Sequence, residues 1–276
     1  MLECWVDQSG TPIGERLLTR LIEDDSVRGC IIFAEPGSVK TTLMGQLVDA
    51  FTQRAPDGWT PTVVEFRAFL QRAWYGGLGL AETAEKVLTE AESGPKRGVM
   101  FMDLPVPRVR RVLTPLARRD DTLFVGLASD PRIQDKAVRV RNELRQRGHD
   151  DSDVQAILDR YQMSTDLDAQ ESALAVHTMA SEEIIQHSMH ETVREAQMLL
   201  DQKFVTLDDI ELPPSAADLP TDLRRVFQMK IAHVRYLLFG AMGMSEDRAQ
   251  IVLGDYDPNR VVRWSQAAID RFAYEP

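Results

Sequence analysis

The sequence contains little cysteine and no long apolar run, and both absences limit what kind of protein it encodes. Only two cysteines occur among 276 residues, Cys4 and Cys30, which are too few for a disulfide framework. We therefore expect a reducing intracellular compartment, either the cytoplasm or an organelle matrix. The first residues lack the basic and apolar segments of a secretory signal. No apolar run approaches the roughly 18 residues of a membrane-spanning helix, so we expect no membrane span.

Positive charge is also scarce over the whole chain. The net charge of −11 argues against a general nucleic-acid-binding protein. Residues 165–276 carry 10 Lys and Arg against 19 Asp and Glu, whereas residues 96–147 carry 13 basic and 6 acidic groups. A basic stretch inside an acidic protein is typical of a locally held anionic ligand, although solvated helix faces would give the same composition.

Short apolar runs alternate with helical patterns in the first part of the chain. The apolar runs cover residues 29–33, 62–66, 98–103 and 123–127, and helical spacing covers 13–23, 80–91 and the residues from Lys40 onward. This alternation predicts an α/β fold with a parallel sheet flanked by helices. In particular, we expect residues 28–34, 99–103 and 123–127 to form neighbouring parallel strands, followed in the first case by a helix starting near Lys40.

From about residue 165 the pattern becomes helical throughout. Two apolar stripes, Leu174–Leu200 and Leu223–Leu238, have helical spacing, and Ser245 resembles the N-cap of a further short helix. The prolines within 207–220 favour a linker between the two stripes. We therefore expect two units, an α/β domain at 1–164 and an all-helical C-terminal extension at 165–276. The apolar stripes should pack on the first unit or on a protein partner, leaving an acidic surface for a basic partner.

The segment between the first strand and its helix resembles a phosphate-binding loop. Such loops read G-x-x-x-x-G-K-[ST], and their glycines let backbone N–H groups point at phosphate oxygens. Here the corresponding residues are Ala34-Glu-Pro-Gly-Ser-Val-Lys-Thr41. The lysine and the hydroxyl residue are present, but both glycines are replaced, by Ala34 and by Val39. A β-branched side chain just before the lysine would intrude on the ligand and restrict the backbone.

Three further stretches make the chain resemble the adenylate kinase family of nucleoside-monophosphate kinases over residues 28–164. Residues 98–108 end in Asp103-Leu-Pro-Val-Pro-Arg108 and are similar to the D-G-F-P-R strand of that family, with one extra residue. Residues 147–151, Arg-Gly-His-Asp-Asp, followed by Arg160, are similar to its lid and last phosphate-contacting helix. Residues 66–73 resemble the monophosphate-binding helix, with Arg67 or Arg72 as phosphate contact. A zeta-toxin-like kinase is an alternative, weaker match.

The resemblance implies a P-loop kinase fold and a set of site residues. It would give catalytic roles to Lys40, Arg108, Arg147 and Arg160, nucleotide contacts to Gly37, Ser38, Lys40, Thr41 and Thr42, and Mg²⁺ binding to Thr41 and Asp103. The cofactors implied are ATP and Mg²⁺ if the site functions, and none otherwise.

Two functions are compatible with this sequence. The first hypothesis is a degenerate adenylate-kinase-like protein with impaired or absent nucleotide binding, which serves as a structural or interaction subunit of a larger assembly; Ala34, Val39 and the acidic C-terminal region favour it. The alternative is an active ATP-dependent nucleoside-monophosphate kinase, favoured by Lys40, Thr41 and the arginines. Glu183, His187, His190 and Glu191 share one helical face, but we expect a solvated polar surface there and no metal site.

Overall fold

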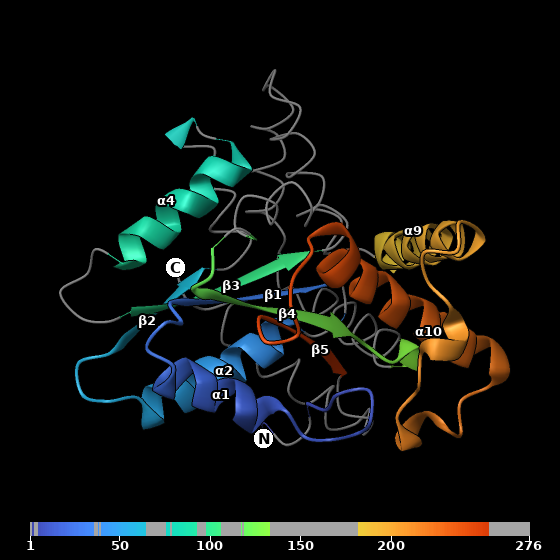
Figure 1. The fold of residues 1–276 in the computed structure, drawn as a ribbon, viewed down its shortest axis with the longest axis horizontal. Coiled ribbons are helices and arrows are strands. Elements are labelled where there is room, and N and C mark those ends of the chain that lie inside the picture. Colours follow the sequence, from blue (N-terminus) through green and yellow to red (C-terminus); the bar gives the residue numbers. More distant parts are fainter. Residues whose placement is uncertain are drawn as a thin grey trace, which may run out of the picture.

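The chain forms a parallel sheet covered by helices on both faces in a computed structural model (Figure 1). The structure describes Leu2, Ser38 and Ala117 and the ranges 5–35, 40–64, 76–77, 79–92, 98–105, 119–132 and 182–253. Its strands are β1 (Gly29–Ala34), β2 (Thr60–Val64), β3 (Gly98–Pro105), β4 (Thr122–Ala128) and β5 (Ala249–Leu253). Its helices are α1 (Gly14–Glu23), α2 (Lys40–Arg54), α4 (Leu80–Glu92), α9 (Glu182–Asp201) and α10 (Thr221–Arg235).

The strands lie in the order β2-β3-β1-β4-β5, and each described pair is parallel. The expected neighbours are therefore confirmed, because β1 pairs with β3 on one side and with β4 on the other. Helix α2 begins at Lys40, as the spacing of its apolar residues predicts. The structure is thus an α/β fold with a parallel sheet flanked by helices.

Residues of β1 and β4 alternate between two apolar clusters, as the two-residue period of a strand requires. Cys30, Ile32 and Ala34 face the cluster formed with α1 and α2, whereas Ile31 and Phe33 face the cluster formed with α10. All six residues of β1 are buried. The central strand is therefore apolar on both sides, which is why it reads as a continuous apolar run instead of an alternating one.

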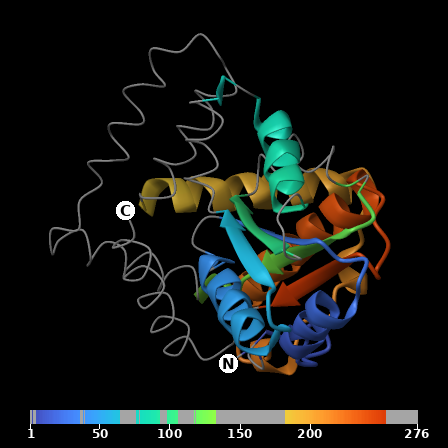
Figure 2. The same ribbon diagram turned by 90° about the vertical axis from the view of Figure 1, so that its left-hand side faces the viewer.

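Helices α1 and α2 cover one face of the sheet, and α10 covers the other (Figures 1 and 2). Phe227, Ile231 and Val234 of α10 pack among residues of β1 and β4. The second predicted stripe therefore packs on the sheet. Helix α9 lies against α10, where His233 Nε2 and Glu195 Oε2 are 2.7 Å apart.

The expectation of an all-helical C-terminal extension is wrong. Residues 249–253 form β5, which pairs with β4 and completes the sheet. Ser245 does not begin a helix, since its carbonyl accepts hydrogen bonds from the amides of Arg248 and Ala249 in the turn before β5. The Ile251-Val252-Leu253 run carried the strand signal, but it is short and follows a long helical region.

The predicted linker is also a packed segment. It contains two short 3-10 helices, Leu207–Asp209 and Pro214–Ala216, and a six-residue π-helical segment, Tyr236–Ala241, follows α10. Ile210, Ala216 and Leu219 are buried in the cluster beneath α10. The prolines therefore mark tight turns on the core. The expected boundary at 164/165 lies outside the described residues, and the division into two units stays a prediction.

Candidate functional site

The topology of the sheet points to the carboxyl ends of its strands as the place for a ligand. After β1 the chain crosses to β2, and after β3 it crosses in the opposite sense to β4, so the connections diverge next to β1. In open parallel sheets, ligands bind at such a point, outside the carboxyl ends of the strands. The predicted phosphate loop lies there, between Ala34 at the end of β1 and Lys40 at the start of α2.

The described residues of this loop are buried. Glu35, Ser38 and Lys40 have 5%, 1% and 2% of their surface exposed, respectively. Gly37 and Val39 lie outside the described residues, and so do the side chains of Thr41 and Thr42, whose backbone forms the first turn of α2. The sheet therefore brings Ser38 and Lys40 together at the predicted place.

A buried ion pair links this loop to the C-terminal part of the chain. Lys230 Nζ on α10 lies 3.1 Å from Glu35 Oε2, and both side chains are more than nine-tenths buried. Removing two charged groups from water costs desolvation free energy, and a buried charge is tolerated only when an opposite charge compensates it. The pair therefore ties the residue that follows β1 to the middle of α10, although the two residues are far apart in sequence.

Hydrogen bonds from the end of β4 extend this connection. Lys230 Nζ donates to the carbonyl of Ser129 at 3.4 Å, and Ser129 Oγ donates to the carbonyl of Ser38 at 3.0 Å. Ser129 is itself 1% exposed. The loop, the end of β4 and α10 thus share one buried polar network, which we call the loop network: Glu35, Ser38, Ser129 and Lys230.

A second polar cluster follows β4 immediately after the loop network. The buried carboxylate of Asp130 accepts hydrogen bonds from the Arg132 amide at 2.8 Å and from its guanidinium Nη2 at 2.7 Å. Arg132 also lies 3.2 Å from the exposed carboxylate of Asp218. The hydrogen bond to Asp130 raises the pKa of Arg132 above its ordinary value. This cluster fixes the chain after β4 to the turn before α10.

Asp103 lies on β3, where its backbone is in register with Ile32 of β1. It is therefore placed on a strand next to the loop, two residues before β3 ends, as the resemblance implies for a Mg²⁺-binding carboxylate. Its side chain lies outside the described residues. The predicted phosphate contacts Arg67, Arg72, Arg108, Arg147 and Arg160 also lie outside them. The structure thus leaves the proposed arginine cluster as a prediction.

Other reactive groups in the described chain offer no alternative centre. Burial raises the pKa of the Cys30 thiol to about 12, so this cysteine is no nucleophile at neutral pH. Of the helical face considered for metal, His190 is exposed, and no group of three potential ligands occurs in the described ranges.

Sequence reasoning missed Glu35, Ser129 and Lys230, yet each carried a signal. Lys230 lies three residues after Phe227 and four before Val234, so a charged residue interrupts an otherwise apolar helical face. Ser129 directly follows the buried strand β4, at the end of the sheet where the carboxyl ends of the parallel strands lie. A charged residue within an apolar stripe requires a buried partner, and the carboxylate that supplies it could have been sought in the loop.

Within the part of the chain that the structure describes, no helix combines the length and the apolarity needed to cross a bilayer. Comparisons of the chain with protein-family models, with curated proteins and with solved structures gave no match in any of the three.

Proposed function

We propose that this chain is a degenerate adenylate-kinase-like P-loop protein, in which nucleotide binding is impaired or absent and the fold serves as a structural or interaction subunit of a larger assembly. The observation that carries the proposal is the buried pair of Glu35 with Lys230. In this arrangement the loop residues stabilise the packing of α10 on the sheet. The loop thereby has a structural role that requires no ligand.

The same pair gives a phosphate no added attraction at this place. A phosphate loop attracts anions through backbone N–H groups and a lysine, whereas Glu35 adds a buried carboxylate to the loop. Lys230 compensates this carboxylate, so the pair adds no net positive charge that would attract a phosphate. The pair therefore supplies no attraction for anions that would offset the loss of the glycines at Ala34 and Val39.

An active nucleoside-monophosphate kinase is the second candidate. It is supported by the position of Lys40 at the first residue of α2 and by Asp103 on the neighbouring strand. In that case Lys40, with ATP and Mg²⁺, would stabilise the charge on the transferred phosphoryl group, and Asp103 would hold the metal or its water. The two candidates differ in one measurable property, the affinity for nucleotide.

Calorimetric titration with ATP and Mg²⁺ tests the proposal. We expect no heat of binding up to about millimolar nucleotide, because each 1.4 kcal/mol lost at the site lowers the affinity about tenfold. The double variant Ala34→Gly/Val39→Gly should bind measurably, and adding Lys40→Ala to it should remove the gain. Submicromolar binding by the unaltered chain would overturn the proposal and favour the kinase alternative.

A further inference from the structure

Among the described residues, only the N-terminal segment pairs with the outer edge of β5. Val6 pairs with Leu253 in an antiparallel bridge, with hydrogen bonds of 3.1 and 2.7 Å between their backbone groups. The turn at residues 7–11 then leads the chain away toward α1. Within the described ranges, the N-terminal segment therefore covers the carboxyl end of this edge, and no other strand pairs with its amino-terminal half, which we call the open half.

Some backbone groups on the open half have no hydrogen-bond partner in the described chain. In the parallel pairing with β4, Gln250 and Val252 turn their amides and carbonyls inward, so those of Ala249, Ile251 and Leu253 point outward. The outward amide of Ala249 donates to the carbonyl of Ser245. The described residues offer no hydrogen bond to the outward groups of Ile251 or to the Ala249 carbonyl.

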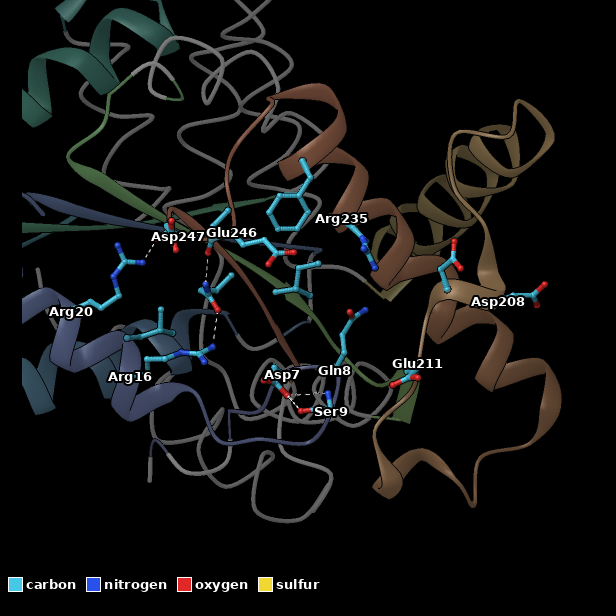
Figure 3. Close-up of a pocket in the computed structure, with 16 residues that line it drawn as sticks. Asp7, Gln8, Ser9, Arg16, Arg20, Asp208, Glu211, Arg235, Glu246 and Asp247 are labelled. Carbon is cyan, nitrogen blue, oxygen red and sulfur yellow. Dashed lines mark hydrogen bonds between the residues drawn. The ribbon is translucent and has the colours of Figure 1, made fainter.

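A cleft of about 1020 Å³ lies beside this open edge (Figure 3). One wall is α1, and the opposite wall contains the segment of Asp208 and Glu211 together with Arg235 of α10. Glu246 and Asp247 lie at the amino-terminal end of β5, and Asp7 lies at the other end (Figure 3). The cleft therefore follows the direction of β5 and gives access to its free backbone groups.

The lining of this cleft is acidic, with six carboxylates and three guanidinium groups. Two of these arginines are engaged within the protein, because Arg16 donates to Gln250 Oε1 at 2.9 Å and Arg20 donates to the Asp247 carbonyl. By contrast, the carboxylates of Asp208, Glu211 and Glu246 make no ion pair with the described residues. The lining therefore has more carboxylates than guanidinium groups, and this excess of negative charge favours a positively charged ligand.

Charges near an edge strand can also serve to prevent pairing. Protective charges usually project from the edge strand itself. Here β5 reads Ala-Gln-Ile-Val-Leu and carries no charged side chain. The carboxylates belong to the walls, where they would flank an added strand without blocking the backbone of β5.

We propose that the open edge of β5 binds an extended, basic segment of another protein, which adds a strand to the sheet within the acidic cleft. Main-chain hydrogen bonds to Ile251 and to the Ala249 carbonyl would supply pairing, and lysine or arginine side chains would meet the carboxylates of the walls. A second copy of this chain is disfavoured as occupant, because two β5 edges side by side would bring two acidic clefts together. The inference rests on the proposed interaction role and names its partner chemistry.

Fluorescence anisotropy with synthetic peptides and the full chain tests this inference. The probe is a labelled eight-residue peptide of alternating lysine and valine, compared with a glutamate–valine peptide and with a lysine–valine peptide N-methylated at alternate residues. We expect binding of the lysine peptide alone, with at least about tenfold weaker binding after N-methylation, because main-chain pairing is lost. Equal binding of the methylated peptide, or no binding of the lysine peptide up to about millimolar concentration at physiological salt, would overturn the proposal.

Two protein variants locate the binding site. Ile251→Pro removes an outward amide and leaves the hydrogen bonds between β5 and β4 in place. It should lower the affinity for the lysine peptide at least about tenfold. The double variant Asp208→Lys/Glu211→Lys should lower this affinity about fivefold or more. The control Glu23→Lys/Glu85→Lys makes the same charge change outside the cleft and should leave the affinity nearly unchanged. Equal loss in both double variants would mean that net charge alone attracts the peptide, which would refute the cleft as its site.

Sedimentation and nucleotide titration separate the other outcomes. A dimer of the unaltered chain that Ile251→Pro dissociates would show that the occupant is a second copy, and the proposal would then be wrong. Nucleotide binding by the unaltered chain would refute the proposed loss of nucleotide binding and would leave the peptide result unaffected. Should Ile251→Pro fail to fold, the N-methylated peptide still decides the question with unaltered protein.

Discussion

The two faces of the sheet are covered by segments that come from opposite parts of the chain. Helices α1 and α2 cover one face, and they lie within 20 residues of β1 along the sequence, with Leu17 and Leu47 among their buried residues. Helix α10 covers the other face and packs Phe227 and Ile231 on strands that precede it by about 100 residues or more. One face is thus built from local contacts, and the other from distant ones.

This difference explains why α10 and β5 belong to the core of the fold. Without residues 182–253, Phe33 and Phe124 would lose their apolar neighbours on one side of the sheet, and β4 would become an edge strand. The loop network lies between the two sets of contacts, because Glu35 follows the strand shared by both faces and Lys230 comes from α10. Disrupting the distant contacts, the loop network and the local contacts should therefore reduce stability to decreasing extents.

Truncation after residue 164 should have the largest effect. The fragment would expose the apolar face of β1 and β4 and leave β4 unpaired on one side, so we expect aggregation or loss of a cooperative unfolding transition. Circular dichroism during heating and size-exclusion chromatography would measure this result. A fragment that remains monomeric and unfolds cooperatively would show that the distant contacts are dispensable.

Loss of Lys230 should come next. Lys230→Met leaves Glu35 as a buried carboxylate without this partner, and we expect a loss of about 3–5 kcal/mol in the free energy of unfolding. The double variant Glu35→Gln/Lys230→Met removes both charges and should be more stable than Lys230→Met. Urea denaturation of the unaltered protein, Glu35→Gln, Lys230→Met and the double variant gives the coupling energy. Additive effects would mean that the ion pair does not join the loop to α10.

The sheet face covered by α1 and α2 could be predicted from the sequence far better than the face covered by α10. The apolar run at 29–33, the helical spacing after Lys40 and the order of the strands sufficed to place β1, α2, β3 and β4. Pairing of β5 with β4 could not be inferred, because 120 residues separate the two strands and five residues carry little pattern. In the candidate site, Ser38 and Lys40 followed from a loop motif. The pairing of Glu35 with Lys230 depends on how α10 docks, which no local pattern specifies.

Two glycines, one for each face, should give effects of opposite sign. A Cβ on Gly126 of β4 would lie 2.3 Å from Val234 Cγ1 of α10, so the helix can approach the sheet only because this side chain is absent. Gly126→Ala should therefore cost about 1–3 kcal/mol of stability, as overpacked cores do. A Cβ on Gly45 of α2 meets nothing within 4 Å, so Gly45→Ala should stabilise the protein by about 0.5–1 kcal/mol. Denaturation midpoints that move in the same direction would contradict this contrast.

The ion pair between α1 and α2 should give the smallest effect, and one that depends on pH. Arg54 makes two hydrogen bonds to the Glu15 carboxylate, one of them 3.1 Å long, and they hold the pKa of Glu15 below its ordinary value. Because the pKa is lowered on folding, the stabilisation is present above the unfolded-state value and is lost as the pH falls through the folded one. Both side chains are about half exposed, so water and salt screen most of the interaction.

Glu15→Gln should accordingly lower the melting temperature at pH 7 by no more than about 2 °C, and the difference should be smaller at pH 3. Glu23→Gln on the same helix is the matched control, since Glu23 forms no ion pair with the described residues and should show no such pH dependence. Calorimetric scans at both pH values make the measurement. A larger effect at pH 3 than at pH 7 would reverse the sign expected from the lowered pKa. The contacts between α1 and α2 would then need an explanation other than this pair.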